Sequence, residues 1–234
     1  MGGWADDDGS TSARTSGQTK IEIANSLRLT DEVHRLARGA IETRSFRMTP
    51  ALLCDLHRIA MDAVIEGAGE YRKVDEPCPI RGSRHQPPTW QEVPAYVESM
   101  CSFINALPPL FLPDLEHPDF DDALAVGVNT AAYALWRVNW IHPFEDGNGR
   151  TSRALCYLIF TVHGGMLMPG VRALPERISS ESQKFYRCLE ASDIAHKKKR
   201  AIRLQQSVNF IRKHILAQLA ELAEVQRISR PPGE

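Results

Sequence analysis

Apolar residues recur three and four positions apart in successive segments of this chain, and that spacing is typical of one face of an α-helix. The pattern is clear over residues 121–140, where Leu124, Val128, Ala131 and Leu135 share a face. Short extended pieces are confined to the proline-rich residues 71–88. We therefore predict an all-α fold, built as a bundle of amphipathic helices around one core.

Capping residues mark where several of these helices begin. The predicted starts lie at Thr30, at Thr49-Pro50 and at Thr89 of the capping box TWQE. Further helices are predicted at about 149–163, 182–191 and 204–222. Gly164-Gly165 is typical of a helix C-terminus and should end the first of these.

The chain divides into one large domain with a tail at each end. Residues 1–19 are rich in Gly, Ser, Thr and Asp, and we predict a disordered tail. A helical segment over 20–48 leads into the main domain over 49–222, and residues 223–234 form a C-terminal tail. Within the domain, residues 71–88 hold four prolines and a Gly-Ser turn, which predicts a small β-hairpin, or flap.

Charge and hydropathy argue against several classes of partner. The chain has 28 Lys and Arg against 29 Asp and Glu, so no overall basic field favours nucleic acid or an acidic membrane. No apolar run approaches the roughly 20 residues that span a bilayer, and no signal peptide follows Met1. The five cysteines are scattered without a CxxC pair, as in a reducing compartment. We predict a cytoplasmic protein with no nucleic-acid or membrane partner.

The sequence HPFEDGNGRTSR, residues 142–153, carries more chemistry than a connection between two helices needs. Gly147 and Gly149 leave backbone amides unshielded just before a helix start, where the positive end of the helix also favours an anion. Arg150 and Arg153 lie three residues apart on one helix face, so both can reach the same phosphate chain. This part of the sequence predicts a phosphate site.

Three further residues of this stretch extend the phosphate site to a reaction centre. Asp146 lies beside much positive charge, which is best explained by a Mg²⁺ ion that it binds and that bridges phosphate oxygens. Asn148 can offer its amide to a phosphate oxygen. His142, with an ordinary pKa near 6.5, suits the removal of a proton from an incoming hydroxyl at neutral pH. We predict a nucleotide–Mg²⁺ site with a base poised for attack on phosphorus.

These twelve residues resemble the signature of the Fic family, H-P-F-x-D/E-G-N-G-R-x-x-R, at every defined position. The resemblance covers roughly residues 45–212. It includes GAGEYRKV at 67–74, similar to the G-x-Y-R sequence that begins the Fic flap, and FYRCLEASD at 185–193, similar to the aromatic pair below the adenine. Fic proteins are mostly α-helical and usually transfer AMP from ATP to a Ser, Thr or Tyr hydroxyl of another protein. The resemblance thus implies a Fic-type helical bundle with a β-hairpin flap, acting as a protein adenylyltransferase on ATP and Mg²⁺.

The resemblance also implies roles for single residues. His142 would be the general base, Asp146 the Mg²⁺ ligand, and Arg150 and Arg153 the residues that hold the outer phosphates. The anion hole would be formed by Gly147, Asn148 and Gly149. The nucleoside would lie near Phe185, Tyr186 and Asp193. The flap would pair with an extended segment of the target through Ile80, Gly82 and Ser83.

Many Fic proteins are restrained by a helix carrying S/T-x-x-x-E-G/N, whose glutamate pairs with the second arginine of the signature. Here RGAIETR, residues 38–44, lies just before the predicted helix start at Thr49 and makes Glu42 the candidate. Arg38 and Thr43 depart from the pattern. If Glu42 has no such role, a separate antitoxin chain could supply the glutamate, or no such restraint exists.

Other activities on the same fold stay open at this point. They are the transfer of UMP or phosphate, and the removal of AMP from modified proteins with Glu42 orienting a water. The phosphotransferase branch of the family resembles HxFxNANKR, from which this chain departs at Asp146, Gly147 and Gly149. A non-catalytic interaction module is disfavoured, because a pure binder does not need His142, Asp146 and both arginines.

Overall fold

The computed structural model describes residues 16–74, 85–109, 111, 119–167, 173–198 and 202–229. Within them the chain forms helices and no strand, which confirms the predicted all-α fold. The elements are α1 (Ser16–Thr43), α2 (Pro50–Met61), the 3₁₀ turn η1 (Trp90–Glu92), α3 (Val93–Asn105), α4 (Phe120–Ile141), α5 (Asn148–Gly164), α6 (Leu174–Ser180), α7 (Ser182–Lys197) and α8 (Gln205–Ser229).

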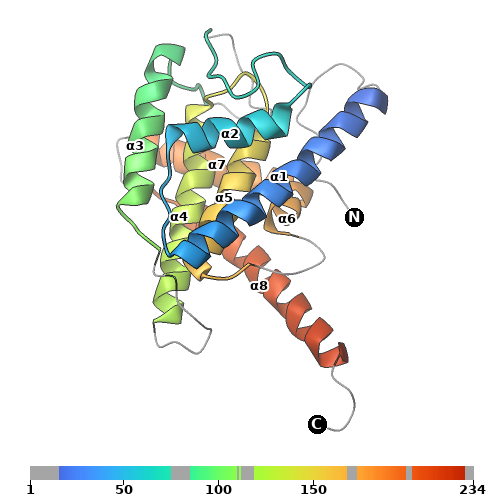
Figure 1. The fold of residues 1–234 in the computed structure, drawn as a ribbon. Helices are drawn as coiled ribbons and strands as arrows, with labels where there is room; N and C mark the ends of the chain where they lie inside the picture. The colour runs from blue at the N-terminus through green and yellow to red at the C-terminus, as the bar shows by residue number, and fades with distance from the viewer. Residues whose placement is uncertain are drawn as a thin grey trace.

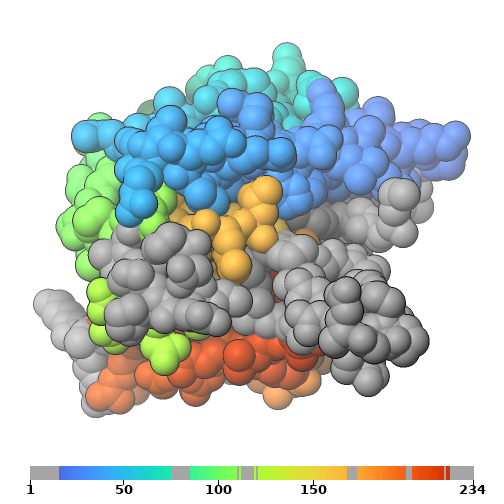
Figure 2. All heavy atoms as spheres, turned by 60° about the horizontal axis from the view of Figure 1, so that its bottom comes forward, coloured from blue at the N-terminus to red at the C-terminus, as the bar shows by residue number. Residues whose placement is uncertain are grey.

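Helices α4 and α5 form the centre of the bundle (Figure 1). Residues 130–139 of α4 and 150–163 of α5 are buried without interruption, as expected for helices covered on every side. Figure 1 shows α1 and α2 crossing in front of this pair, with α3 at one side. Figure 2 shows α1 along one edge of another face and α8 along the opposite edge. The loop between α4 and α5 therefore joins the two most deeply buried helices of the described structure.

Several predicted helix boundaries are confirmed. The hydroxyl of Thr49 accepts a hydrogen bond from the Leu52 amide at 3.1 Å, which caps α2 ahead of Pro50. The Glu92 carboxylate accepts the Thr89 amide at 2.9 Å, as the capping box predicts. Gly165 adopts a positive φ of 65° and ends α5.

The N-terminal boundary was predicted wrongly. Helix α1 begins at Ser16, so residues 16–19 are helical rather than part of a disordered tail. Thr30 lies inside α1 and donates its hydroxyl to the Ser26 carbonyl at 2.8 Å instead of capping a helix. The helix extends further because its earlier turns also have a buried face, which packs on α2 and α5. Tertiary contacts override a local capping signal here.

Three further boundaries differ from the prediction. Helix α6 was not predicted, α7 continues to Lys197 instead of ending near residue 191, and α8 continues through residues 223–229 of the predicted C-terminal tail. Residues 1–15 and 230–234 of the two predicted tails lie outside the described residues. No helix in the described part is long and apolar enough to cross a bilayer.

The predicted flap can be followed only at its ends. Residues 71–74 and 85–88 contain no strand, and residues 75–84 lie outside the described part of the chain. The β-hairpin and its expected target contacts Ile80, Gly82 and Ser83 therefore stay predictions.

Candidate active site

His142 is the first residue after α4 and adopts a left-handed backbone conformation, with φ 49° and ψ 59°. Its amide donates to the Val138 carbonyl at 2.9 Å, so the residue closes the last turn of α4. Few residues other than glycine adopt this conformation, which costs about 1–3 kcal/mol and persists only where the surroundings impose it. The surrounding structure therefore fixes the direction in which the His142 side chain leaves the backbone.

The imidazole of His142 is half-buried at the mouth of the loop. Burial, together with the positive charges of Arg72 and His85, lowers its pKa to about 4, against the opposing effects of the Asn139 carbonyl and Asp146. The ring is therefore neutral at pH 7. Only the neutral ring can accept a proton, so the ring is in the protonation state that a general base requires.

Gly147 makes the turn from the loop into α5, with a positive φ of 74°. A Cβ at this position would lie 2.5 Å from the Met61 sulfur and 3.2 Å from Nε2 of His57. Glycine is therefore required by both backbone conformation and space. The turn leaves the first amides of α5, those of Asn148 and Gly149, at a helix N-terminus, where amides lack intrahelical partners and can bind an anion.

We expect Gly147→Ala to lower the free energy of unfolding by about 2–4 kcal/mol, because it combines overpacking with a strained φ. Urea unfolding followed by circular dichroism measures the change. Gly39→Ala is the matched control: Gly39 lies in α1, and an added Cβ would have no atom within 4 Å apart from its chain neighbours and the backbone of its own helix. There alanine should stabilise the helix by about 0.5–1 kcal/mol. Equal effects at the two positions would contradict the packing argument.

Asp146 has one carboxylate oxygen available for a cation. Its Oδ1 accepts the Gly147 amide at 2.6 Å, whereas Oδ2 makes no hydrogen bond to the described residues, and the side chain is half-exposed. No group of three or more His, Cys, Asp or Glu residues suited to a metal occurs in the described part of the chain. Mg²⁺ is often held by one or two carboxylates together with substrate phosphates. Asp146 therefore fits a Mg²⁺ ion that arrives with a nucleotide.

His57 of α2 holds the backbone of this loop, although the sequence did not single it out. The Gly69 amide donates to its Nδ1 at 2.8 Å, so Nε2 carries the proton and donates to the Asp146 carbonyl at 2.9 Å. The buried ring stacks on Phe144 at 3.7 Å, and burial lowers its pKa to about 4. The feature of the sequence that could have identified His57 is a histidine within the apolar face of α2.

The two arginines of the motif are almost fully buried on α5. Arg150 donates from Nη2 to Oε1 of Glu22 at 3.2 Å, and Glu22 is itself 5% exposed. Arg150 is thus held by a carboxylate of α1 in this structure. Burial lowers the pKa of Arg153 to about 10, with Tyr186 acting in the opposite direction. That leaves Arg153 charged at pH 7.

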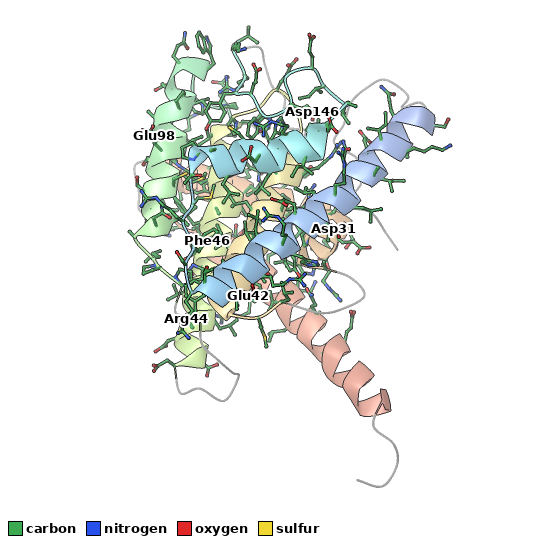
Figure 3. All side chains as sticks on the ribbon, viewed as in Figure 1. Asp31, Glu42, Arg44, Phe46, Glu98 and Asp146 are labelled. Atoms are coloured by element: carbon green, nitrogen blue, oxygen red, sulfur yellow. The ribbon has the colours of Figure 1, made fainter. Side chains whose placement is uncertain are left out.

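Glu42 was the wrong candidate for the glutamate that pairs with a motif arginine: the carboxylate found there is that of Glu22, and it pairs with Arg150, the first arginine of the signature rather than the second. It is exposed near the C-terminal end of α1, and Figure 3 shows it far from Asp146. Glu22 lies 20 residues earlier, or about 30 Å along the helix at 1.5 Å per residue. The sequence feature that could have identified Glu22 is an acidic residue on the same helix face as the apolar Leu29 and Val33.

The side chain of Asn148 makes its hydrogen bonds inside the loop, so it does not offer its carboxamide to a phosphate as predicted. Its oxygen accepts the Phe144 amide at 3.0 Å and its nitrogen donates to the Phe144 carbonyl at 2.8 Å, while the residue is 2% exposed. The carboxamide therefore braces the loop from inside. Only the backbone amide of Asn148 remains a candidate for the anion hole.

The residues expected around the nucleoside separate into two groups. Asp193 lies at a cavity of about 470 Å³, and its Oδ1 accepts the indole N–H of Trp136 at 2.8 Å. Tyr186 is half-exposed. Phe185, by contrast, packs in the hydrophobic core against Phe210 and is 2% exposed, so its ring is a core residue rather than a surface contact for a ligand.

The cavity beside Asp193 adds residues that the sequence had not assigned. It is lined by His85 and Gln86 ahead of α3, Trp140 of α4, and Glu190, Ile194, His196 and Lys197 of α7. Its volume is within the usual range for small-molecule sites, roughly 300–1,000 Å³. Trp140 precedes His142 by two residues, so the cavity adjoins the motif loop.

The fold and the loop together have the features of a Fic domain. The fold is a helical bundle, and HPFEDGNGRTSR joins its two central helices. This loop carries a neutral histidine and a glycine turn ahead of two arginines. Residues 47–160 match the family model of the Fic/DOC family, so this segment of the chain belongs to that family.

Solved structures of Fic proteins share this fold. Fic-1 (residues 134–508) of C. elegans is 20% identical with a TM-score of 0.61, over 95% of this chain and 57% of that one. A Fic domain containing signaling protein of Bacteroides thetaiotaomicron is 19% identical with a TM-score of 0.60, over 92% and 74% of the two chains. A Fic family protein of Desulfovibrio desulfuricans is 17% identical with a TM-score of 0.56, over 95% and 58%. The present chain thus spans little more than half of two of these proteins.

Proposed function

We propose that this protein is an adenylyltransferase that moves AMP from ATP to a Ser, Thr or Tyr hydroxyl of a target protein. The observation that supports this most is the placement of His142. It follows the end of α4, on the same short loop that carries Asp146 and the Gly147 turn into α5. The proposed base, the cation ligand and the anion site therefore lie within a few residues of one another in the sequence.

In the proposed reaction the target hydroxyl attacks the α-phosphorus of ATP. His142 accepts the hydroxyl proton, the new oxygen–phosphorus bond forms, and the bond to pyrophosphate breaks. Bound Mg²⁺ would neutralise charge on the phosphate oxygens, and Asp146 would hold it through the oxygen that makes no contact with the described protein residues. Positioning and charge neutralisation supply most of the acceleration in phosphoryl transfer of this kind.

The first turn of α5 would bind the phosphates. Its amides follow Gly147 and face a region where the helix dipole favours negative charge. Arg153 would contribute a second charge from the buried side of the helix. Arg150 would do so only after leaving Glu22, because a guanidinium nitrogen that donates to a carboxylate is not available to phosphate in the same geometry.

The cavity beside Asp193 is the proposed nucleoside site. Trp140 offers an aromatic surface, and Asp193 offers a carboxylate oxygen beyond the one that Trp136 already uses. Aromatic surfaces bind bases by stacking, and a carboxylate accepts the N–H groups on a base edge. Adenine carries such an amino group.

We further propose that Glu22 restrains the transfer reaction. Its carboxylate forms a buried ion pair with Arg150, and α1 holds it there through a face packed on α5. ATP binding with all phosphates engaged would require this pair to separate. The restraint lies within the chain, so no antitoxin chain is needed to supply the glutamate.

Labelled ATP distinguishes the proposed reaction from other group transfers. Incubation of the Glu22→Gly variant with a lysate, Mg²⁺ and α-labelled ATP should leave label on protein, while γ-labelled ATP should leave none. Chelation of Mg²⁺ should abolish the signal. Label from the γ-position alone would show phosphate transfer, and a strong preference for α-labelled UTP would show UMP transfer. Either result would replace the present proposal.

Removal of AMP is the second candidate, and Glu22 is the observation that favours it. A buried glutamate beside the motif arginines could orient a water towards an AMP–protein bond. The parent protein would then release AMP from a modified target, and Glu22→Gln would stop that release. If the parent protein releases no AMP, this candidate is excluded.

A further inference from the structure

Arg72 is a buried arginine whose guanidinium donates hydrogen bonds to several backbone carbonyls. It is 9% exposed, and its Nε donates to the His142 carbonyl at 2.8 Å. Nη1 donates to the Val74 carbonyl at 3.2 Å, and Nη2 donates to the Pro88 carbonyl. One guanidinium thus joins three backbone positions that are far apart in the sequence.

The backbone of Arg72 adds a fourth contact to the same region. Its amide donates to the Pro143 carbonyl at 2.9 Å. The carbonyls on both sides of Pro143 therefore accept hydrogen bonds from a single residue. On the other side of His142, its own amide bonds to the Val138 carbonyl at the end of α4. His142 is held from both directions.

These contacts account for the unusual conformation of His142. A residue that bears a Cβ enters the left-handed region at a cost, and it stays there only where several contacts impose the geometry. At His142 these contacts are the last turn of α4 and the two bonds from Arg72. The backbone conformation in turn sets the direction of the Cα–Cβ bond from which the imidazole extends.

We propose that Arg72 is a positioning residue for the transfer reaction: it holds His142 in the left-handed conformation that directs the imidazole at the incoming hydroxyl. The inference rests on the proposed function, in which His142 is the base. Arg72 also donates to the carbonyls of Val74 and Pro88. The chain segments on both sides of residues 75–84 are therefore linked through Arg72 to the backbone of His142.

Arginine is the side chain suited to this task. Its planar guanidinium has five N–H donors in a fixed fork, so a single group can serve three carbonyls in defined directions. Lysine keeps the positive charge but offers a compact ammonium on a flexible stem. Arg72→Lys therefore retains charge near His142 and removes the geometry.

The test compares Arg72→Lys with Arg177→Lys, both in the Glu22→Gly background. Arg177 is similarly buried, at 8%, and pairs with Glu221 on α8, so it controls for the general effect of replacing a buried arginine. We expect Arg72→Lys to lower kcat for α-label transfer by about 10- to 100-fold, as for misplaced catalytic groups, with nucleotide affinity by calorimetry within about twofold. Arg177→Lys should leave kcat unchanged.

A crystal structure of Arg72→Lys provides a readout that does not need activity. The φ of His142 should leave the left-handed region, and an unchanged φ would overturn the inference. An unchanged kcat, or a loss of kcat matched by an equal loss in Arg177→Lys, would also overturn it. If Arg72→Lys does not fold, the neutral Arg72→Gln variant, which can still donate to one carbonyl, decides by the same two measurements.

Separate results would exclude the proposed adenylyltransferase activity and the positioning role of Arg72. If the Glu22→Gly protein transfers no α-label, the proposed function fails, while the conformation of His142 in the Arg72 variants still decides whether Arg72 positions it. If transfer occurs and Arg72→Lys is fully active, only the positioning role is lost.

Discussion

The Glu22→Gly variant is expected to transfer α-labelled AMP about 5- to 150-fold faster than the parent protein, the range of a typical coupling between two states of a site. The substitution removes the carboxylate that holds Arg150 at 3.2 Å, so the guanidinium becomes available to ATP phosphates. Initial rates with α-labelled ATP, measured on a lysate or by auto-modification, give the ratio directly.

Glu42→Gly is the matched control for this experiment. It makes the same substitution in the same helix, but at an exposed position remote from the motif loop. Its rate should equal that of the parent protein. Glu22→Gln serves as a second control, because it removes the charge without placing glycine inside α1, where glycine costs about 1 kcal/mol. Activation by Glu42→Gly, or none by either Glu22 variant, would contradict the proposed restraint.

His142→Ala, made in the Glu22→Gly background, should lower α-label transfer by about 10²- to 10⁴-fold, the usual contribution of a general base. Alanine also disfavours the left-handed backbone at this position, so His142→Asn is the better-matched variant, since asparagine tolerates that conformation. Both variants should still bind Mg²⁺–ATP in calorimetry. Transfer at the parent rate in His142→Asn would remove the histidine from the reaction.

The pH dependence of the same reaction follows from the lowered pKa of His142. Its ordinary value is near 6.5, and in the folded protein it is about 4. The base is therefore already neutral above about pH 5, and kcat/KM should show no loss attributable to His142 between pH 8 and that point. Activity should fall only as the pH approaches 4. A fall centred on pH 6.5 that disappears in the His142 variants would show an unperturbed histidine.

The sequence by itself determined the helical architecture and the identity of the motif loop. Helical periodicity and caps are local: Thr49 caps α2 through a residue three positions away, and the α4 and α5 ranges depend on spacing within each helix. The motif is likewise contiguous, so His142, Asp146 and Gly147 could be assigned before any fold was known.

The tertiary structure alone decided which residues surround that loop. Glu22 reaches Arg150 across 128 positions, His57 reaches Asp146 across 89, and Arg72 reaches His142 across 70. None of these separations leaves a periodic trace in the sequence, because such contacts depend on how whole helices pack rather than on neighbouring residues. For the same reason Glu42 was a plausible but wrong choice: it lies on the correct helix, but at the end remote from the motif loop.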